Sequence, residues 1–384
     1  MKGFKIALIA VLTTLAVGLV IVLAGVLSGG FGGLSWGVNW PLMGGYRIMP
    51  DGGAVFGNAT LQAETELKGD NIREISVDFE KTGCDIFFLP SKDDSIRVKE
   101  YYTKEIDEDR RAQINMTGGS LVIKQRLNTG LRTSIQNVSG YVEIYIPGTV
   151  YCVLKKLDVS TTSGDVSLPK WDGADELNMD KLEISTTSGD IDVDWMRAEE
   201  GKINSTSGSV TMGVMFGNLS MNATSGDMEV SEIEGHLVMN GTSGSQSAGI
   251  VRGDLDMGST SGDLEAEYVS GDVKMNTVSG WQRVGGMAGK GSFGSTSGDI
   301  TVKVEELNGS LDFESTSGDI QITVPSGSSF TTDINTTSGD IDTSFDDKLS
   351  FNKRRTSASG NVGQDLQYRI KANTTSGDIK IHER

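Results

Sequence analysis

Aspartates that recur beside glycine are the residues of this 384-residue chain whose type and spacing best suit metal chemistry. Asp299, Asp319 and Asp340 each follow a Ser-Gly pair, and carboxylate oxygens are ligands that Ca²⁺ prefers. A calcium-binding β-roll needs the fuller pattern G-G-x-G-x-D-x-U-x, whereas each turn here carries at most one aspartate. We therefore predict that these aspartates cap turns and that no metal is bound. A calcium-binding module that uses these three residues is the lesser alternative.

The chain offers little for acid–base, nucleophilic or nucleotide chemistry. Its two histidines, His236 and His382, have no neighbours in sequence that suggest a catalytic triad, and its two cysteines lack zinc-finger spacing. The glycines lie between short apolar segments, without the helix that receives a phosphate in a nucleotide-binding loop. The net charge of −18 argues against a nucleic-acid partner, because phosphate binding requires a positive surface. We predict that the protein is not an enzyme and has no cofactor.

Trp281 and Arg283 form the pair of side chains that departs most sharply from the repeated pattern. Trp281 occupies the position that aspartate takes after other Ser-Gly pairs, and Arg283 lies two residues further along. An exposed aromatic ring beside a cation can stack on a sugar, so the pair is a candidate ligand contact. The alternative is that Trp281 packs under the following loop, GGMAGKG, and has only a structural role.

A repeat of 18 residues must position all of these side chains. Ser-Gly recurs with serine at 207, 225, 243, 261, 279 and 297, which gives five consecutive equal intervals. Between the glycines, apolar residues alternate with polar ones, as in Leu219-x-Met221 and Met228-x-Val230, and this period of two is typical of strands with one buried face. Each unit therefore holds two strands and two turns, and successive units can stack in parallel.

The repeat predicts an all-β fold, a parallel β-solenoid (β-helix-like) of about 18-residue coils. A second glycine period of nine favours flattened, two-sided coils over the three hexapeptides of a left-handed β-helix. In such a stack Leu219, Leu237 and Leu255 lie over one another. We also expect a buried methionine ladder and an amide ladder along the stack. Their members are Met221, Met239, Met257 and Met275, and Asn204, Asn222, Asn240, Asn276, Asn335 and Asn373.

The N-terminal residues have a different character. We predict a cytoplasmic stub at 1–5, a transmembrane helix at 6–27, and a glycine-rich tether at 28–53. Lys2 and Lys5 precede the apolar stretch, so the positive-inside rule places the N-terminus in the cytoplasm and the rest outside the cell membrane. A cleaved signal peptide is the alternative.

Residues 54–157 are predicted to form an irregular β N-terminal capping region, followed by the solenoid repeats at 158–384. Charge balance marks the change, because residues 201–340 hold 18 acids and 6 bases, a net of −12, whereas 54–157 are nearly neutral. Cys84 and Cys152 lie in the capping region and form either one disulfide or two buried thiols. The last residues of the chain, IHER, are expected to protect the opposite end of the stack.

The segment VEIYIPGTVYCVLKKLDVSTTSGDVSL (142–168), with the TTSGDI repeats that follow it, resembles a bacterial domain family of unknown function labelled "putative adhesin". The resemblance covers residues 70–384 and implies a membrane-anchored β-solenoid of the cell envelope. It supplies no catalytic residues. We therefore expect a non-enzymatic protein that binds or scaffolds at the bacterial envelope through an envelope glycan or another envelope protein. The alternative is an accessory or sensor in an envelope-stress response.

Overall fold

The computed structural model describes residues 46–48, 54–56, 59–69, 71–79, 84–108, 111–125, 139–170 and 177–384. The predicted stub, membrane helix and most of the predicted tether lie outside these residues. Within the described residues, no helix is long and apolar enough to cross a membrane. β1 (Tyr46–Ile48) and β2 (Ala54–Phe56) form a separate antiparallel pair.

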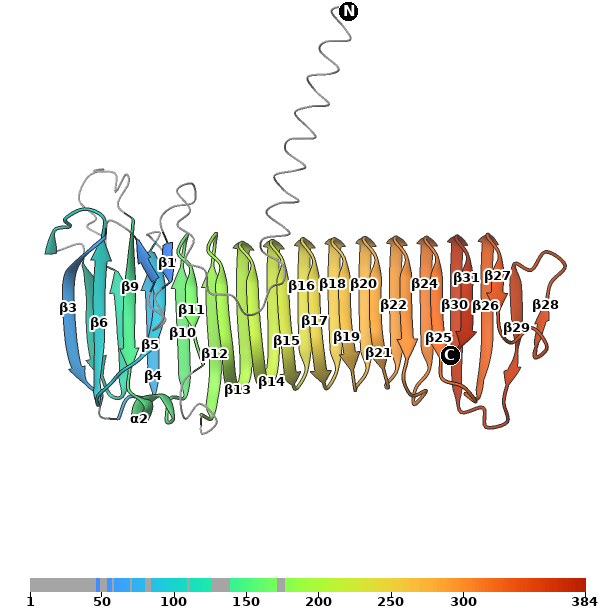
Figure 1. Ribbon diagram of the computed structural model, residues 1–384, viewed down its shortest axis with the longest axis horizontal. Coiled ribbons are helices and arrows are strands. Elements are labelled where there is room, and N and C mark those ends of the chain that lie inside the picture. Colours follow the sequence, from blue (N-terminus) through green and yellow to red (C-terminus); the bar gives the residue numbers. More distant parts are fainter. Residues whose placement is uncertain are drawn as a thin grey trace, which may run out of the picture. The chain divides into compact units, whose positions relative to one another are not determined.

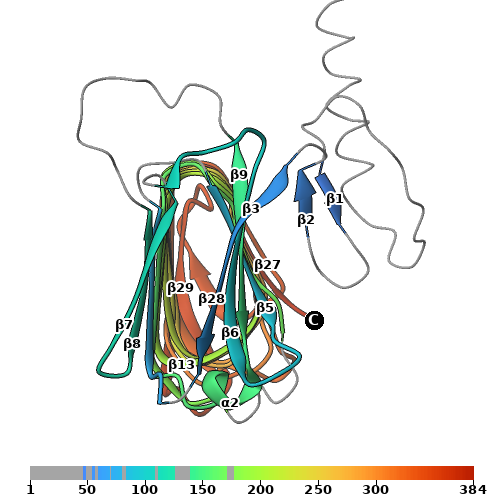
Figure 2. The same cartoon turned by 90° about the vertical axis from the view of Figure 1, so that its left-hand side faces the viewer.

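The described part from residue 59 onward is built of strands, with one helical turn, α2 (Gly148–Tyr151). The strands form two faces that lie opposite each other when the stack is viewed from its end (Figure 2). We call the strands that precede each Ser-Gly turn face 1 and the strands that follow it face 2. The predicted all-β, solenoid-like architecture with two strands in each coil is therefore confirmed.

Face 1 consists, in spatial order, of β7 (Ala112–Thr117), β8 (Ser120–Gln125), β4 (Glu74–Phe79), β10 (Lys156–Thr161), β12 (Met179–Thr186), the second halves of β13 (Ile191–Ser207) and β14 (Val210–Ser225), β16 (Leu237–Ser243), β18 (Leu255–Ser261), β20 (Val273–Ser279), β22 (Gly291–Ser297), β24 (Leu311–Ser317), β30 (Tyr368–Ser376), β26 (Phe330–Ser338), β29 (Ser357–Val362) and β28 (Leu349–Phe351).

Face 2 consists of β3 (Thr60–Lys68), β6 (Ser95–Tyr102), β9 (Gly140–Ile146), β5 (Cys84–Pro90), β11 (Val166–Leu168), the first halves of β13 and β14, β15 (Met228–Glu234), β17 (Gln246–Arg252), β19 (Leu264–Val269), β21 (Gln282–Met287), β23 (Ile300–Val304), β25 (Ile320–Val324), β31 (Ile379–Glu383) and β27 (Ile341–Thr343).

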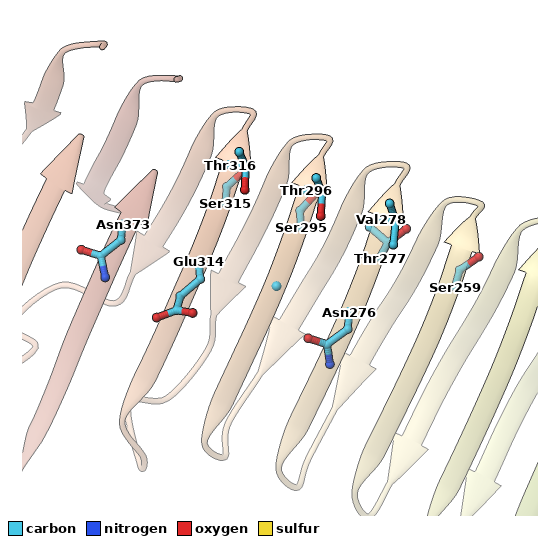
Figure 3. A pocket seen from close by; sticks show the side chains of 11 residues that line it. Ser259, Asn276, Thr277, Val278, Ser295, Thr296, Glu314, Ser315, Thr316 and Asn373 are labelled. Carbon is cyan, nitrogen blue, oxygen red and sulfur yellow. The ribbon is translucent and has the colours of Figure 1, made fainter. Parts of the chain in front are cut away.

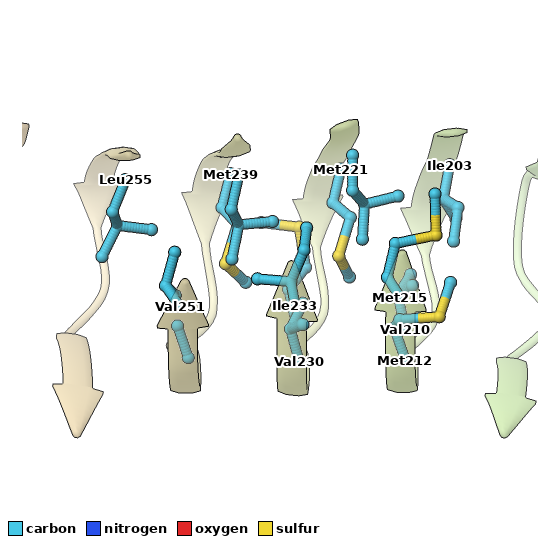
Figure 4. Packing of buried hydrophobic residues seen from close by; sticks show 14 of the residues in the cluster. Ile203, Val210, Met212, Met215, Met221, Val230, Ile233, Met239, Val251 and Leu255 are labelled. Atoms are coloured by element: carbon cyan, nitrogen blue, oxygen red, sulfur yellow. The ribbon is translucent and has the colours of Figure 1, made fainter. Parts of the chain in front are cut away.

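Equivalent residues of successive coils lie in columns, as the 18-residue period predicts. Leu219 pairs with Leu237, which pairs with Leu255, and all three are at most 2 % exposed. The four methionines of the predicted ladder are fully buried beside the leucine column, and Figure 4 shows two of them, Met221 and Met239, inside the stack. Because burying one such side chain contributes about 1.5–3 kcal/mol, every coil adds a similar increment of stability to the stack.

The Ser-Gly turns require glycine for two independent reasons. Gly226 has a φ of +148°, a region that side chains with a Cβ rarely adopt. A Cβ at this position would also lie 2.3 Å from the carbonyl oxygen of Gly208 in the preceding coil. The column of turn glycines therefore lets the coils approach to normal strand spacing, about 4.8 Å.

Both ends of the stack depart from sequence order. The last strands of the chain, β30 and β31, do not lie at the end but between β24–β25 and β26–β27 (Figure 1). β29 and β28 then pair antiparallel beyond β26. The prediction that the final residues IHER close the stack is therefore wrong. The antiparallel strands β29 and β28 lie at that end, and the last strands, β30 and β31, pair between earlier coils.

The N-terminal end has the same kind of arrangement. The coil formed by β4 and β5 lies between the coil of β8 and β9 and the coil of β10 and β11. Antiparallel pairs then continue each face, β7 on face 1 and β6 with β3 on face 2. Parallel stacking thus extends from residue 74 onward and includes part of the region predicted as a cap.

Cys84 and Cys152, both within the described residues, are not joined as a disulfide. Cys84 is buried in β5, and burial is the main reason that the pKa of its thiol is raised well above the ordinary value, with Asp85 contributing second. A raised pKa keeps the sulfur in its thiol form and unreactive. Of the two alternatives, the structure contains the thiols, but only Cys84 is fully buried, whereas Cys152 is partly exposed.

Candidate functional site

The aspartates that follow the Ser-Gly pairs bind the backbone of the neighbouring coil. The backbone N–H of Asp319 donates to Asp299 Oδ1 at 2.9 Å, and that of Asp378 donates to Asp319 Oδ1 at 2.8 Å. Asp340 in turn donates its N–H to Asp378 Oδ1 at 2.9 Å. The three calcium candidates are therefore not consecutive, because the inserted C-terminal coil places Asp378 between Asp319 and Asp340.

This arrangement assigns the aspartates a structural role. The carboxylates of Asp299, Asp319 and Asp378 each accept an N–H at the point where the chain leaves the turn, and this bond links adjacent coils in addition to the strand pairing. Among the described residues there is no group of three or more His, Cys, Asp or Glu side chains arranged to hold a metal ion.

Trp281 and Arg283 lie where β21 begins on face 2. Trp281 is 40 % exposed, and its backbone N–H donates to Asp263 Oδ1 at 3.0 Å, as the backbone N–H groups of the aspartates do in other coils. Arg283 forms an ion pair of 3.5 Å with Glu265 of the preceding coil. Trp281 thus presents an open aromatic surface, whereas the charge of Arg283 is engaged by a neighbouring carboxylate.

A groove of about 500 Å³ lies on face 1 and crosses β18, β20, β22, β24 and β30 (Figure 3). Four strand spacings of about 4.8 Å separate its outermost strands, so it is about 19 Å long. Its lining consists of Ser259, Asn276, Thr277, Val278, Gly294, Ser295, Thr296, Glu314, Ser315, Thr316 and Asn373. The groove is therefore a polar surface with hydroxyl, amide and carboxylate groups along its length.

The groove exists because the asparagine ladder is interrupted at Gly294. The predicted ladder is formed in part: Asn222 Nδ2 donates to Asn204 Oδ1 at 3.2 Å, and Asn240 Nδ2 donates to Asn222 Oδ1 at 3.3 Å. Asn276 is not part of it, because glycines lie opposite it on both sides. Gly294 occupies the same register between Asn276 and Glu314 and contributes no side chain. The missing side chain leaves a hollow between Asn276 and Glu314.

A second column of small residues lies next to this row, on the inward-facing side of the same strands. In several coils this column carries threonine, whose hydroxyl donates to a glycine carbonyl, as Thr374 does to Gly318 at 3.2 Å. The groove has serines at three of these positions, Ser259, Ser295 and Ser315. Their hydroxyl oxygens are buried and have no hydrogen-bond partner among the residues that the structure describes. The three serines share the inward-facing side of their strands with Met257, Phe293 and Phe313, so these hydroxyls lie toward the interior of the coil and not in the groove.

The floor of the groove is fixed from the interior of the coil. Gln282 is 1 % exposed, and its Nε2 donates to the carbonyl oxygen of Gly294 at 2.5 Å. The same contact recurs two coils away, where Gln246 Nε2 donates to the carbonyl oxygen of Gly258 at 2.7 Å. A buried amide thus holds the backbone of each glycine that interrupts the ladder.

The lining carries little charge. Glu314 is the one ionisable side chain among the lining residues, all of which the structure describes, and Lys371 lies 3.0 Å from its carboxylate. Glycoside hydrolysis uses a pair of carboxyl groups, and a single paired carboxylate does not supply one. The arrangement is suited to hydrogen bonding a ligand at the surface.

One turn at the edge of the groove is unusually apolar. Val278, which lines the groove, is 49 % exposed, and Trp281 follows across the same Ser-Gly turn. In the flanking coils the corresponding residues are threonine and, in most cases, aspartate. Sequence reasoning identified Trp281 but missed the groove. The signal was present at Gly294 and Val278, each of which departs from the residue usual in its own column.

The model of a family described as Toastrack DUF4097 matches residues 72–269 and 218–382. Among curated proteins no match was found.

Solved structures that resemble the chain include a "putative adhesin" of Bacteroides fragilis, with 12 % identity, a TM-score of 0.33, and coverage of 85 % of this chain and 97 % of that one. A "putative cell adhesion protein" of Clostridium sporogenes has 9 % identity and a TM-score of 0.18, and covers 84 % and 99 %. A "putative lipid binding protein" of Parabacteroides distasonis has 14 % identity and a TM-score of 0.27, and covers 84 % and 97 %.

Proposed function

Because the chain belongs to the Toastrack DUF4097 family, whose model covers most of its length, we propose that it is a non-enzymatic binding or scaffolding protein of the bacterial envelope. In this proposal the apolar stretch 6–27 anchors it in the cell membrane, and the solenoid lies on the extracytoplasmic side. The family assignment indicates the fold, whereas the proposed function depends on the surface.

The observation that carries the proposal is the groove on face 1. It is an open surface lined by hydrogen-bonding groups, with one ionisable side chain. Such a lining can recognise a partner but lacks the acid–base pair and the water-excluding enclosure that catalysis usually requires. The aspartates, which would be the other candidates for chemistry, accept backbone N–H groups of adjacent coils.

The location is tested by producing the full chain with a C-terminal tag in a bacterial host. We expect the protein in the membrane fraction after a high-salt wash, and we expect external protease to remove the tag from intact spheroplasts. A chain lacking residues 6–27 is the matched control and is expected to leave the membrane fraction. Recovery of the full chain in the soluble cytoplasm, or a tag that is protected until lysis, would contradict the proposal.

Binding is tested separately, with the full chain held in phosphatidylcholine nanodiscs and mixed with lipid-extracted cell-wall material from the same host. We expect the loaded nanodiscs to sediment with the wall material, whereas empty nanodiscs remain in solution. Equal sedimentation of the two would count against a role in envelope binding.

A further inference from the structure

We propose that strand β7 (Ala112–Thr117) is an interface through which two copies of this chain associate end to end. This inference goes beyond the proposed function and rests on the geometry of one strand. β7 is the outermost strand of face 1 at the N-terminal end of the stack, and among the described strands it pairs only with β8. Figure 2 looks onto this end of the molecule. The outer edge of β7 is therefore the edge of a sheet.

The β7–β8 hairpin fixes the direction of the backbone groups of β7. Thr117 and Ser120 pair across a turn of two glycines with positive φ, the geometry in which the flanking residues exchange hydrogen bonds. Hydrogen-bonded pairs alternate along an antiparallel ladder, so Ile114 and Met116 belong to the other set, and their N–H and C=O groups point away from β8. No described residue outside the hairpin forms a backbone hydrogen bond with them.

The first residue of the strand agrees with this alternation. The N–H of Ala112, two residues before Ile114, donates to Glu100 Oε2 of β6 at 2.9 Å and not to β8. A buried carboxylate thus binds the beginning of the edge, whereas the backbone groups of Ile114 and Met116 further along are open. A row of unpaired N–H and C=O groups is a template on which another strand can pair.

The other three strands that end the two faces are protected against such pairing, and β7 is not. β3 carries Glu64, Glu66 and Lys68 along its length, and β27 and β28 are only three residues long. Charge and shortness are common means by which proteins block edge-to-edge pairing. β7 has six residues with the uncharged sequence AQINMT, and Met116 within it is 46 % exposed.

The strand is complementary to itself, which identifies the partner as a second copy. When two β7 strands pair antiparallel about a two-fold axis at Asn115, each Ile114 lies opposite Met116 of the second copy. Each of these pairs exchanges both of its N–H···O bonds, so every open group of both copies is used. The side chains of Ile114 and Met116 lie on the interior side of the sheet, opposite the fully buried Ile123 and Leu121 of β8. Pairing therefore also covers the exposed methionine.

Charge favours this end of the stack as the contact between copies. The net charge of −18 makes two copies repel, and residues 201–340 carry a net of −12, whereas residues 54–157 are nearly neutral. One strand pair buries less area than the roughly 1,600 Å² of a standard interface, so we expect a weak dimer in dilute solution. Anchoring in one membrane would raise the local concentration and favour the dimer. β3 extends face 2 one strand beyond β6, so the copies meet at an angle and not in line.

Cysteine cross-linking tests the contact and its register. Asn115 lies on the proposed axis, where opposite residues of a non-hydrogen-bonded pair have Cα atoms about 4.5 Å apart, a separation that a disulfide can join. We expect Asn115→Cys, in a Cys152→Ser background, to form a disulfide-linked dimer on mild oxidation of the full chain in detergent. Gln113→Cys is the matched control on the same exposed side of β7. It is expected to remain monomeric, because its two copies would lie about 14 Å apart along the strands.

A mixture of two variants checks the same register. Gln113 lies opposite Thr117 of the second copy, so chains with Gln113→Cys are expected to cross-link to chains with Thr117→Cys. Absence of the Asn115→Cys dimer, or an equal yield of dimer in Gln113→Cys alone, overturns the proposal.

Sedimentation velocity measures the association without a cross-link. The dimer fraction of the full chain is expected to increase with protein concentration through the micromolar range. Met116→Lys places a charge on the edge and is expected to raise the dissociation constant of the dimer at least tenfold, with the unfolding midpoint retained. Leu366→Lys makes the same kind of change at a residue that is 37 % exposed near the other end of the stack, and its dissociation constant is expected to stay within twofold of wild type. A dimer that persists in Met116→Lys, or a chain that is monomeric throughout, overturns the proposal.

The outcomes separate this inference from the proposed function and from other occupants of the edge. Dimers formed through β7 by a chain that fractionates with the cytoplasm would reject the envelope location alone. A membrane-anchored chain in which Asn115→Cys forms no disulfide would reject the β7 interface alone. Cross-linking of Asn115→Cys to a different protein of the host, and not to a second copy, would show another occupant and overturn the proposal.

Discussion

The inserted C-terminal coil makes a prediction that a simple stack would not make. Ile379 lies five residues before the last residue of the chain, yet it is fully buried and pairs with Ile320 on one side and Ile341 on the other. We predict that Ile379→Ala lowers the free energy of unfolding as much as the same change in the middle of the solenoid. Replacing a fully buried isoleucine by alanine costs about 2–5 kcal/mol, because transfer free energy is lost and a cavity remains.

The matched control is Ile300→Ala in β23, which removes the same atoms from the same column in a central coil. The two costs are expected to agree within about 1 kcal/mol, within the spread that local packing produces at identical substitutions. A residue in a fraying terminal strand would instead cost less than about 0.5 kcal/mol.

Hydrogen exchange is the primary assay, because repeat proteins often unfold in parts and a single global transition is not assured. The N–H of Ile379 donates to the carbonyl oxygen of Asp340 at 3.0 Å, and the N–H of Ile320 donates to that of Asp378 at 2.9 Å. Both amides are expected to be protected like those of the central coils, and Ile379→Ala is expected to expose both. Rapid exchange at Ile379 in the wild type, or a cost below 0.5 kcal/mol, would refute the inserted order.

Three further predictions concern single side chains. Gly258→Asn is expected to stabilise the fold by about 0.5–1.5 kcal/mol in urea unfolding, because it removes a glycine from a strand and extends the asparagine ladder from Asn240. A loss of stability would contradict this. Burial raises the pKa of Glu100, so the contribution of this residue to stability is greatest at low pH and is lost as the pH rises through that pKa. The unfolding midpoint is therefore expected to increase when the pH is lowered from 7 to about 5, and to increase less in Glu100→Gln. Asp319→Ala removes the acceptor for the N–H of Asp378 and is expected to lower the free energy of unfolding by about 1 kcal/mol. Calcium is expected to leave the melting temperature of the wild type unchanged, and a calcium-dependent rise would argue for a metal site.

The columns of the solenoid could be predicted from the sequence because period and chemistry agree at every position. Leu219, Leu237 and Leu255 are equally spaced, equally apolar and flanked by the same turns, so only one register buries all of them. The asparagine ladder follows from the same spacing. Its Nδ2–Oδ1 bonds are formed where asparagines are adjacent in the stack, as between Asn240 and Asn222.

The order of the last coils could not be predicted, for a physical reason. Ile320, Ile341 and Ile379 occupy the same position of three similar units, so exchanging two of these units preserves every side-chain column. The repeat therefore does not distinguish sequence order from the observed order. What distinguishes them is the antiparallel pairing of β29 with β26, which covers the outer edge and leaves the slot between β24 and β26 for β30.

The repeat also explains where a binding site can arise. Residues that match the pattern are engaged by neighbouring coils: the aspartates accept backbone N–H groups, and threonines such as Thr374 donate to glycine carbonyls. A side chain held in this way has little capacity left for a ligand. Gly294 and Val278 break the pattern within two adjacent coils, and there the surface is hollow and exposes apolar area. In a solenoid whose regular positions maintain the stack, recognition is expected at the irregular ones, so the departures from the period are the residues to substitute first.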